Sequence, residues 1–242
     1  MKLCVAQTRP IKGDMARNRA KHTQCIELAV SQGADLIIFP ELSITGYEPA
    51  LAHELATTPD DRRFADFQTL SDAHAIIIGV GLPTPTEAGV CITMALFHPN
   101  QPWQTYSKQY LHADEEPFFV SGRNATLLVR NQPTIALAIC YELSIAEHAQ
   151  RAAEQGAEIY IASVAKTAQG VEKAFQRLVD IAGTYAMTVL MANSVGPSDD
   201  FVSGGKTAIW NPAGRLLAHL NDTDEGILVL NTDTQDVLAK TL

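Results

Sequence analysis

The chain has 242 residues, 46% of them hydrophobic and 19% charged, with a formal net charge of -9. This composition is ordinary for a globular protein, and its acidic residues form no long run, which excludes disorder and gives no reason to expect nucleic acid or membrane as a partner. No stretch reaches the ~18 apolar residues of a membrane span and the N-terminus lacks a signal-peptide pattern, so we expect one cytoplasmic domain over residues 1–242.

The first part of the chain alternates predicted strands and helices. Apolar runs of strand length are separated by segments with helical spacing, and Asp14 and Asp60 are the predicted N-caps. The predicted elements are a strand at 2–7, a helix at 15–32, a strand at 34–39, a helix after Asp60, a strand at 75–82 and hairpin strands at 90–99 and 104–111.

The same order of elements returns from residue 134 onward. The predicted elements are strands at 134–139, 158–163 and 188–193, helices at 145–155 and 171–186, and hairpin strands at 206–212 and 227–231 that extend the second sheet. The halves also share a short motif, "GADLIIF" at 33–39 and "GAEIYIA" at 156–162. These similarities indicate an internal pseudo-repeat.

The fold class follows from the need to bury both faces of each sheet. Each half predicts a sheet with helices on one face, and the remaining apolar face needs a partner. Packing the two sheets against each other satisfies both. We therefore expect an α/β fold, a four-layer α-β-β-α sandwich built from two pseudo-repeated β-α-β-α-β halves.

The four cysteines, Cys4, Cys25, Cys91 and Cys140, are widely separated and form no CxxC pair, which predicts neither a disulfide framework nor a zinc site. Three lie within apolar patterns and are expected to be inert core residues. Cys140, in "ICYELS", instead follows a predicted strand, at a tight turn whose backbone N–H groups would favour a thiolate. From this stretch alone, a fourth core cysteine stays an alternative.

Two further residues occupy unusual positions. Glu41, in "PELSITGYEP", follows the strand at 34–39, at the sheet edge where α/β proteins place functional groups, although a loop carboxylate can equally be a satisfied turn residue. Lys108, in "YSKQYL", lies between Tyr106 and Tyr110, a setting that favours burial over a solvated surface position.

Together these three stretches resemble the Glu-Lys-Cys set of the nitrilase, or carbon-nitrogen hydrolase, superfamily. "FPELSITGYEP" resembles the family's glutamate motif, "YSKQYL" its lysine motif and "ICYELSIAE" its cysteine motif, in the family's order and at similar separations. The resemblance extends to "GADLIIFPE", "FVSG" and "GKTAIWNPAGRLL", so it spans nearly the whole chain.

The resemblance implies roles that the chemistry explains. A thiol with a pKa of ~8.5 is mostly protonated at neutral pH, so Glu41 would accept the proton as the sulfur of Cys140 attacks. Lys108 and the N–H of Tyr141 would stabilise the charge that develops on the carbonyl oxygen. Glu41 would then protonate the leaving group and activate the water that hydrolyses the thioester. No metal or organic cofactor is required.

The family also has a further glutamate that helps to position the lysine or the substrate. Glu115 corresponds to it, while its neighbour Glu116 leaves the assignment open. A metal site built from His112, Asp114 and Glu115 is disfavoured, because no second histidine lies at ligand spacing.

The expected substrate contacts come from residues that flank these motifs. Tyr47, Phe119 and Tyr141 are predicted to line the site, with packing in the core as the alternative. Lys166 falls near a position where family members often carry tryptophan, and we hypothesise that it binds a substrate carboxylate, a surface lysine being the alternative. The cysteine motif lacks an arginine and a proline common in the family, so substrate preference cannot be transferred.

We therefore expect a cysteine-dependent hydrolase that cleaves a non-peptide C–N bond of a small linear amide and releases ammonia through a thioester. Hydrolysis of N-carbamoyl amines or nitriles would use the same residues and stays an alternative. The alternatives from another class are a catalytically silent member that binds metabolites, and a redox-sensing thiol. The resemblance also implies a homodimer or larger homo-oligomer.

Overall fold

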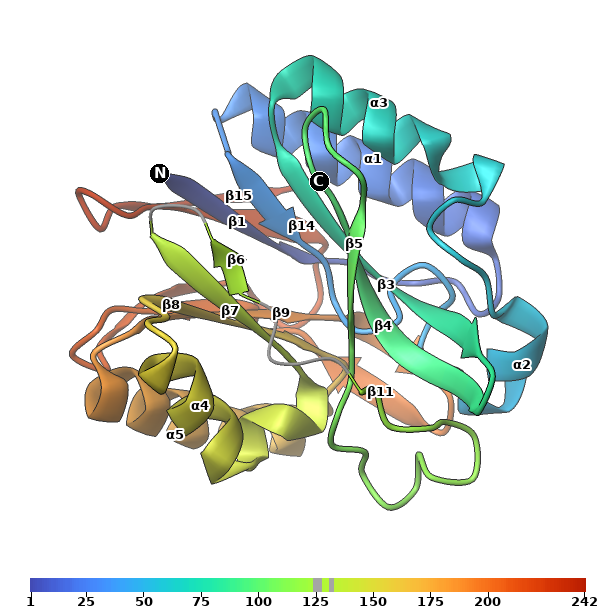
Figure 1. Ribbon diagram of the computed structural model, residues 1–242. Helices are drawn as coiled ribbons and strands as arrows, with labels where there is room; N and C mark the ends of the chain where they lie inside the picture. The colour runs from blue at the N-terminus through green and yellow to red at the C-terminus, as the bar shows by residue number, and fades with distance from the viewer. Residues whose placement is uncertain (124–127, 131–132) are drawn as a thin grey trace.

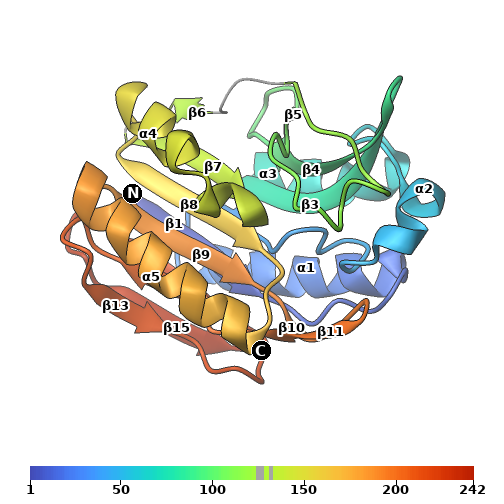
Figure 2. The ribbon, with the colours of Figure 1, turned by 90° about the horizontal axis from the view of Figure 1, so that it is seen from below.

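The computed structural model describes residues 1–123, 128–130 and 133–242, in which two large β-sheets pack face to face between layers of helices (Figure 1). α1 and α3 cover one sheet, and α4 and α5 cover the other (Figures 1 and 2). The predicted four-layer α-β-β-α sandwich is confirmed. The helices are α1 (Met15–Ser31), α2 (Ala52–Leu55), α3 (Ala65–His74), α4 (Ala146–Glu154) and α5 (Ala168–Tyr185).

The first sheet has seven strands in the order β15-β14-β1-β2-β3-β4-β5. β1, β2 and β3 run parallel, whereas β4 and β5 continue the sheet as antiparallel strands, as predicted for this hairpin. The strands are β1 (Lys2–Gln7), β2 (Leu36–Ile38), β3 (Ile77–Thr86), β4 (Gly89–Phe97), β5 (Gln104–Ser107), β14 (Gly226–Asn231) and β15 (Val237–Thr241).

The second sheet has six strands in the order β13-β12-β9-β8-β7-β6, with β7, β8 and β9 parallel. A separate two-stranded sheet pairs β10 with β11. The strands are β6 (Leu128–Arg130), β7 (Thr134–Ile139), β8 (Ile159–Val164), β9 (Thr188–Asn193), β10 (Val195–Ser198), β11 (Phe201–Gly204), β12 (Ala208–Trp210) and β13 (Leu216–His219).

One strand joins a different sheet from the one predicted. The segment at 227–231 forms most of β14, which pairs antiparallel with β1 of the first sheet, Lys2 lying opposite Asn231. Its predicted partner β12 instead pairs with β9 and β13 of the second sheet. The prediction was wrong because an apolar pattern identifies a strand and its buried faces but not the neighbour to which it hydrogen-bonds.

The helix starts differ in detail from the sequence-based expectation. Asp14 caps α1 as predicted, its side chain accepting a hydrogen bond from the N–H of Arg17. Asp61, and not Asp60, is the cap of the second helical segment, and it accepts from the N–H of Arg63 in a short 3₁₀ turn that precedes α3. The two adjacent aspartates look alike in sequence, and only the backbone geometry selects one.

Three apolar clusters fill the spaces between the four layers. One lies between the sheets, one beneath α1 and α3, and one beneath α4 and α5. Beside these clusters, several ionisable residues are also buried: Glu41, Lys108, Glu115 and Glu142. Because charged side chains are almost never fully buried without partners, they mark the candidate site. No helix within the described ranges is long and apolar enough to cross a membrane.

Candidate active site

The loop that carries Glu41 follows β2 and is held by the neighbouring strand. The N–H of Ile44 donates to the carbonyl of Gly81 in β3 at 3.0 Å. A Cβ atom at Gly81 would lie 2.4 Å from the N atom of Leu42 and 2.7 Å from the O atom of Pro40. Only glycine permits this close approach, and the close approach fixes where Glu41 begins.

Lys108 extends the β5 edge of the first sheet. Its N–H donates to the carbonyl of Ile92 at 2.8 Å, and its own carbonyl accepts from the N–H of Gly122 at 2.7 Å. Its backbone is therefore held on both sides, and its side chain is 0% exposed. The expectation of burial from its apolar neighbours agrees with this position.

Cys140 is the first residue of a 3₁₀ turn, Cys140–Ser144, that follows β7 directly. Its φ is 45°, in the left-handed region that residues other than glycine rarely adopt. Cys4, Cys25 and Cys91 are buried, whereas Cys140 is partly exposed. A strained, partly exposed residue at the head of a turn differs in kind from three packed core cysteines.

The two carboxylates predicted for the site bind the same ammonium group. Nζ of Lys108 donates to Oε1 of Glu41 at 2.8 Å and to Oε1 of Glu115 at 2.6 Å. Glu115 also accepts from the hydroxyl of Tyr47 at 2.9 Å and from the N–H of His112 at 2.7 Å. The cluster is a lysine fixed between two acids, one of them held in turn by a loop and a tyrosine.

The structure distinguishes between the two adjacent glutamates of this loop. Glu115 is 1% exposed and contacts Lys108, whereas Glu116 is exposed to solvent. Burial and the ion pair therefore single out Glu115. Within the described part of the chain, no group of three His, Cys, Asp or Glu side chains is arranged to hold a metal ion.

The electrostatics of the cluster assign its protons at neutral pH. Burial, and then the charge of Glu41, raise the pKa of the Cys140 thiol to about 11. Burial raises the pKa of Glu41 to about 6, although Lys108 opposes this shift. Burial lowers the pKa of Lys108, but the surrounding negative groups, first Glu41, outweigh it and the net shift is upward. The thiol is thus protonated, Glu41 is mainly ionised, and Lys108 is an ammonium.

One carboxylate oxygen of Glu41 is left available. Oε1 accepts from Lys108, whereas Oε2 is buried and has no hydrogen-bond partner among residues 1–123, 128–130 and 133–242. The Cys140 side chain is close enough to lower the pKa of Glu41 through a hydrogen bond, an effect smaller than those of burial, Lys108 and Glu115. A buried carboxylate oxygen whose nearest proton source is the neighbouring thiol has the arrangement of a base that can accept that proton.

Lys166 lies beyond the end of β8, close to this cluster. Its N–H donates to Oδ1 of Asn193 at 2.9 Å, and its carbonyl accepts from the N–H of Gly204 at 2.8 Å. Its charge lowers the pKa of the Cys140 thiol, against the larger effects of burial and Glu41. The Lys166 ammonium makes no ion pair or hydrogen bond with any other described residue. An unpaired positive charge therefore acts on the sulfur.

The three aromatic residues predicted to line the site have different surroundings. Tyr47 is half-buried and bonded to Glu115, Tyr141 is half-buried with its ring centroid 5.1 Å from that of His112, and Phe119 is 4% exposed. Phe119 packs in the apolar cluster between the sheets. The two tyrosines therefore border the cluster of ionisable groups, while Phe119 packs as a core residue.

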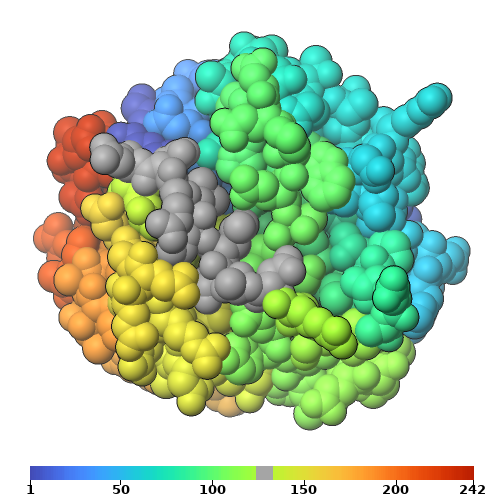
Figure 3. Space-filling model, in the orientation of Figure 1, coloured from blue at the N-terminus to red at the C-terminus, as the bar shows by residue number. Residues whose placement is uncertain are grey.

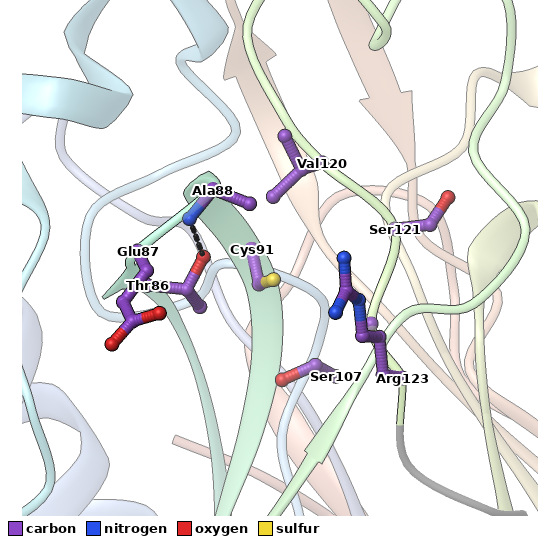
Figure 4. A pocket seen from close by; sticks show the side chains of 9 residues that line it. Thr86, Glu87, Ala88, Cys91, Ser107, Val120, Ser121 and Arg123 are labelled. Atoms are coloured by element: carbon purple, nitrogen blue, oxygen red, sulfur yellow. Dashed lines mark hydrogen bonds between the residues drawn. The ribbon is translucent and has the colours of Figure 1, made fainter.

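A cavity of about 470 Å³ lies beside the β3–β4 hairpin and is separate from this cluster (Figure 4). Cys91, Ser107 and Arg123 are among its lining residues. Successive residues of a strand point to opposite faces, so Ser107 faces away from the side on which Lys108 lies. This cavity does not include Cys140.

Comparison with known proteins decides the family. The family model described as "Carbon-nitrogen hydrolase" matches residues 2–239. The chain belongs to the carbon-nitrogen hydrolase family. It is accordingly an enzyme that acts on carbon-nitrogen bonds other than peptide bonds, and the predicted superfamily is confirmed.

Solved structures share the fold of this carbon-nitrogen hydrolase. A mutant of the amidase from Nesterenkonia sp. AN1, in complex with butyramide, matches with a TM-score of 0.88 and 23% identity, over 97% of this chain and 92% of that one. Another structure of that amidase shows covalent addition of the acetamide moiety of fluoroacetamide at its active-site cysteine, with a TM-score of 0.86 and 24% identity, over 95% and 89% of the chains. At these identities the likeness establishes the fold.

Curated relatives of this carbon-nitrogen hydrolase carry two kinds of name. A glutamine-dependent NAD(+) synthetase from Aquifex aeolicus is 26% identical over 254 residues, which cover 100% of this chain but 44% of the relative. An (R)-stereoselective amidase from Pseudomonas sp. is 24% identical over 222 residues, covering 90% of this chain and 80% of the relative. The chain thus spans less than half the length of the synthetase that it matches.

A further buried polar group beside the site was not predicted from the sequence. Glu142, two residues after Cys140, is 0% exposed and hydrogen-bonds to Tyr106, which also contacts His148. A charged residue three positions after the end of a buried strand is a usable signal. Its partners could not be inferred, because Tyr106 lies in β5 and His148 in α4, and the two residues are distant in sequence from each other.

Proposed function

We propose that this carbon-nitrogen hydrolase cleaves the C–N bond of a small amide through a thioester on Cys140. The observation that carries the proposal is the ammonium of Lys108, held between the buried carboxylates of Glu41 and Glu115 and beside the thiol. Such a site combines a nucleophile, a base and a fixed positive charge, which are the groups that acyl transfer requires.

Acylation begins with attack of the Cys140 sulfur on the amide carbon. The S–H proton passes to Glu41, whose free oxygen is unpaired. The carbonyl π electrons move to oxygen, where Lys108 and the N–H of Tyr141 stabilise the negative charge. When the carbonyl re-forms, the C–N bond breaks, Glu41 returns its proton to nitrogen, and ammonia or an amine leaves.

Deacylation repeats these proton transfers, with water as the nucleophile and the sulfur as the leaving group. Glu41, again a carboxylate, takes a proton from water as the oxygen attacks the thioester carbon. The C–S bond then breaks, the sulfur regains the proton, and a carboxylic acid is released. Glu115, with Tyr47 bonded to it, keeps the Lys108 ammonium aimed at the reacting oxygen throughout.

The direct test is release of ammonia from a panel of short amides, ureas and nitriles. We expect turnover of amides above that of the other two classes. We also expect the Cys140 sulfur to displace fluoride from fluoroacetamide, which leaves one acetamide group on the sulfur. A protein that releases ammonia from no member of the panel would contradict the proposal. Turnover confined to N-carbamoyl amines or to nitriles would assign the same site to that reaction.

The pH dependence of the reaction is expected to follow Glu41. Because the pKa of Glu41 is raised to about 6 and the base must be ionised, kcat/KM should be full above that pH and fall about tenfold per unit below it. The measurement is kcat/KM for an uncharged amide such as butyramide between about pH 4.5 and about pH 8. In the Glu41→Gln variant the residual rate should lack this acidic limb, and a wild-type profile without it would contradict the assignment.

Lys166 favours a second, narrower candidate substrate. We propose that its unpaired ammonium binds a carboxylate on the amide substrate. Glutamine and the monoamides of dicarboxylic acids are substrates that carry both an amide and a carboxylate. Relatives named glutamine-dependent NAD(+) synthetase agree with such a substrate. The chain covers 44% of that relative, so only amide hydrolysis, and not the synthetase activity, is proposed.

Replacing Lys166 by alanine tests this substrate preference. A charge-assisted hydrogen bond contributes about 1.5–3 kcal/mol, so kcat/KM for an acidic amide should fall about 10- to 100-fold. The value for butyramide should change less than about twofold, because that substrate offers no partner for the ammonium. Lys166→Met, which keeps most of the side-chain volume, is the matched control for packing. Equal losses for acidic and neutral amides would remove the carboxylate role.

Further expectations concern the protein as a whole. We propose that residues 1–242 act as one carbon-nitrogen hydrolase domain, because β14 ties the end of the second half to the first sheet. We also propose that the protein forms a homodimer or larger homo-oligomer and works in the cytoplasm. Light scattering on the purified protein measures its oligomeric state. Cell fractionation measures its location in the cell.

A further inference from the structure

A buried carboxylate next to the site bonds to backbone groups on both sides of it. Oε2 of Glu142 accepts from the N–H of Ile139 at 2.8 Å, and Oε1 accepts from the N–H of Gln109 at 2.6 Å. Ile139 immediately precedes Cys140, and Gln109 immediately follows Lys108. One side chain thus connects the backbone of the cysteine turn to that of the lysine segment.

A third donor completes the environment of this carboxylate. The hydroxyl of Tyr106, in β5, donates to Oε2 of Glu142 at 2.8 Å. Since that proton is used, Nε2–H of His148 must donate to the Tyr106 oxygen at 2.9 Å, and Nδ1 of His148 then accepts from the hydroxyl of Tyr160 at 2.9 Å. With this one set of proton positions, every hydrogen bond from Glu142 through Tyr106 and His148 to Tyr160 has a donor and an acceptor.

No positive side chain neutralises Glu142 directly. Within the described residues, neither a lysine nor an arginine forms an ion pair with it, and its nearest basic group is His148 at 3.6 Å. Burial, and then Arg151, lower the pKa of His148 to about 4, which makes the ring neutral at neutral pH. A buried carboxylate held only by uncharged donors is unfavourable for stability, and its presence calls for another explanation.

The two segments that Glu142 connects come from different sheets. Lys108 continues β5 of the first sheet, and Cys140 follows β7 of the second. Green and yellow segments meet near the lower edge of the face shown in Figure 3, and the guanidinium of Arg151 reaches the hydroxyl of Tyr110 at 3.3 Å. The distance between the Cys140 sulfur and the Lys108 ammonium therefore depends on contacts between the two sheets.

We propose that Glu142 is a positioning residue that fixes the cysteine turn relative to the lysine segment. One of its oxygens bonds to the backbone just before Cys140, whose φ is strained. The other bonds to the backbone just after Lys108. A displacement of even 1 Å between nucleophile and oxyanion donor reduces the rate of attack strongly. The inference rests on the proposed amide hydrolysis, in which these two groups act on one carbonyl.

The test compares two variants that perturb the same buried network differently. Glu142→Gln keeps the size of the side chain but turns one acceptor into an NH₂ group, so one backbone N–H loses its partner. Tyr106→Phe removes a hydroxyl from the same carboxylate and keeps both backbone bonds. We expect kcat for an amide to fall about tenfold or more in Glu142→Gln, with KM within about threefold, and to fall less than about threefold in Tyr106→Phe.

A second readout needs no turnover of substrate. Chloroacetamide alkylates Cys140 at a carbon beside a carbonyl, the sulfur displacing chloride and its proton passing to a base, whereas methyl methanethiosulfonate reacts without a carbonyl. The ratio of the two rates at Cys140, followed by peptide mass spectrometry, reports how well the oxyanion donors face the sulfur. We expect this ratio to fall about tenfold in Glu142→Gln and less than about twofold in Tyr106→Phe.

The outcomes separate this inference from the proposed function. An unchanged rate ratio in Glu142→Gln, or an equal fall in Tyr106→Phe, would overturn the positioning role. Absence of amide turnover in the wild type would overturn the proposed function while leaving the alkylation ratio readable. If Glu142→Gln does not fold, Glu142→Asp replaces it, because the shorter carboxylate keeps the charge but cannot reach both N–H groups, and an unchanged ratio there overturns the inference equally.

Discussion

Replacement of Cys140 by alanine is expected to abolish amide hydrolysis, with a loss of at least about 10⁴-fold in kcat/KM. The loss is this large because no other group near the cluster can form the thioester, and Cys4, Cys25 and Cys91 are buried elsewhere. The thermal midpoint should change little, since the substitution removes a single sulfur atom from a residue that is only partly buried. Ammonia release under saturating substrate and the mass of the protein after fluoroacetamide treatment measure the effect.

Cys91→Ala is the matched control for this prediction. It removes another free thiol, one that lines the cavity of Figure 4 away from Lys108, and should leave turnover within about twofold of wild type. Retention of more than about one hundredth of the activity in Cys140→Ala would exclude the covalent mechanism. A thiol that oxidises reversibly without any turnover would instead favour redox sensing.

Lys108→Met is expected to affect both activity and stability. The ammonium is 0% exposed and neutralises two buried carboxylates, so its removal leaves Glu41 and Glu115 as uncompensated charges. Breaking such a buried arrangement costs about 3–5 kcal/mol in the free energy of unfolding. The loss of oxyanion stabilisation should lower kcat about 10²- to 10³-fold. Urea denaturation and steady-state kinetics measure the two effects separately.

The double variant Lys108→Met with Glu115→Gln distinguishes the structural role of the lysine from its chemical one. Removing one of the two charges should restore a large part of the lost stability, because a single buried acid can remain protonated. Activity should stay at the level of the single variant, since the oxyanion still lacks its cation. Recovery of activity together with stability would show that Lys108 acts only as a structural counter-ion.

Much of the fold could be predicted because each strand at the centre of a sheet is buried on both faces. The segments at 2–7, 134–139 and 188–193 are such apolar runs, and their predicted bounds match β1, β7 and β9. The order of the strands within each sheet was harder to predict. β14 is as apolar as the central strands, and nothing in its residues says that β1, far away in sequence, is its neighbour.

The candidate site was predictable where one residue follows one strand. Cys140 comes directly after a parallel strand and Glu41 comes three residues after another, and that position alone raises the expectation of function. The choice between Glu115 and Glu116 required the three-dimensional contact with Lys108, because both residues occupy the same loop. Glu142 escaped notice because its importance lies in backbone groups of other segments, which leave no trace in side-chain identity.

The position of β14 has a consequence for how this protein reaches its native state. Lys2 pairs with Asn231, so one edge of the first strand stays open until almost the whole described chain has been synthesised. Such pairings raise the contact order, which slows folding, and an open apolar strand edge invites association with other chains in the meantime. The first β-α-β-α-β half, although it looks self-contained in sequence, is therefore expected to depend on the last strands for a soluble and cooperative folding transition.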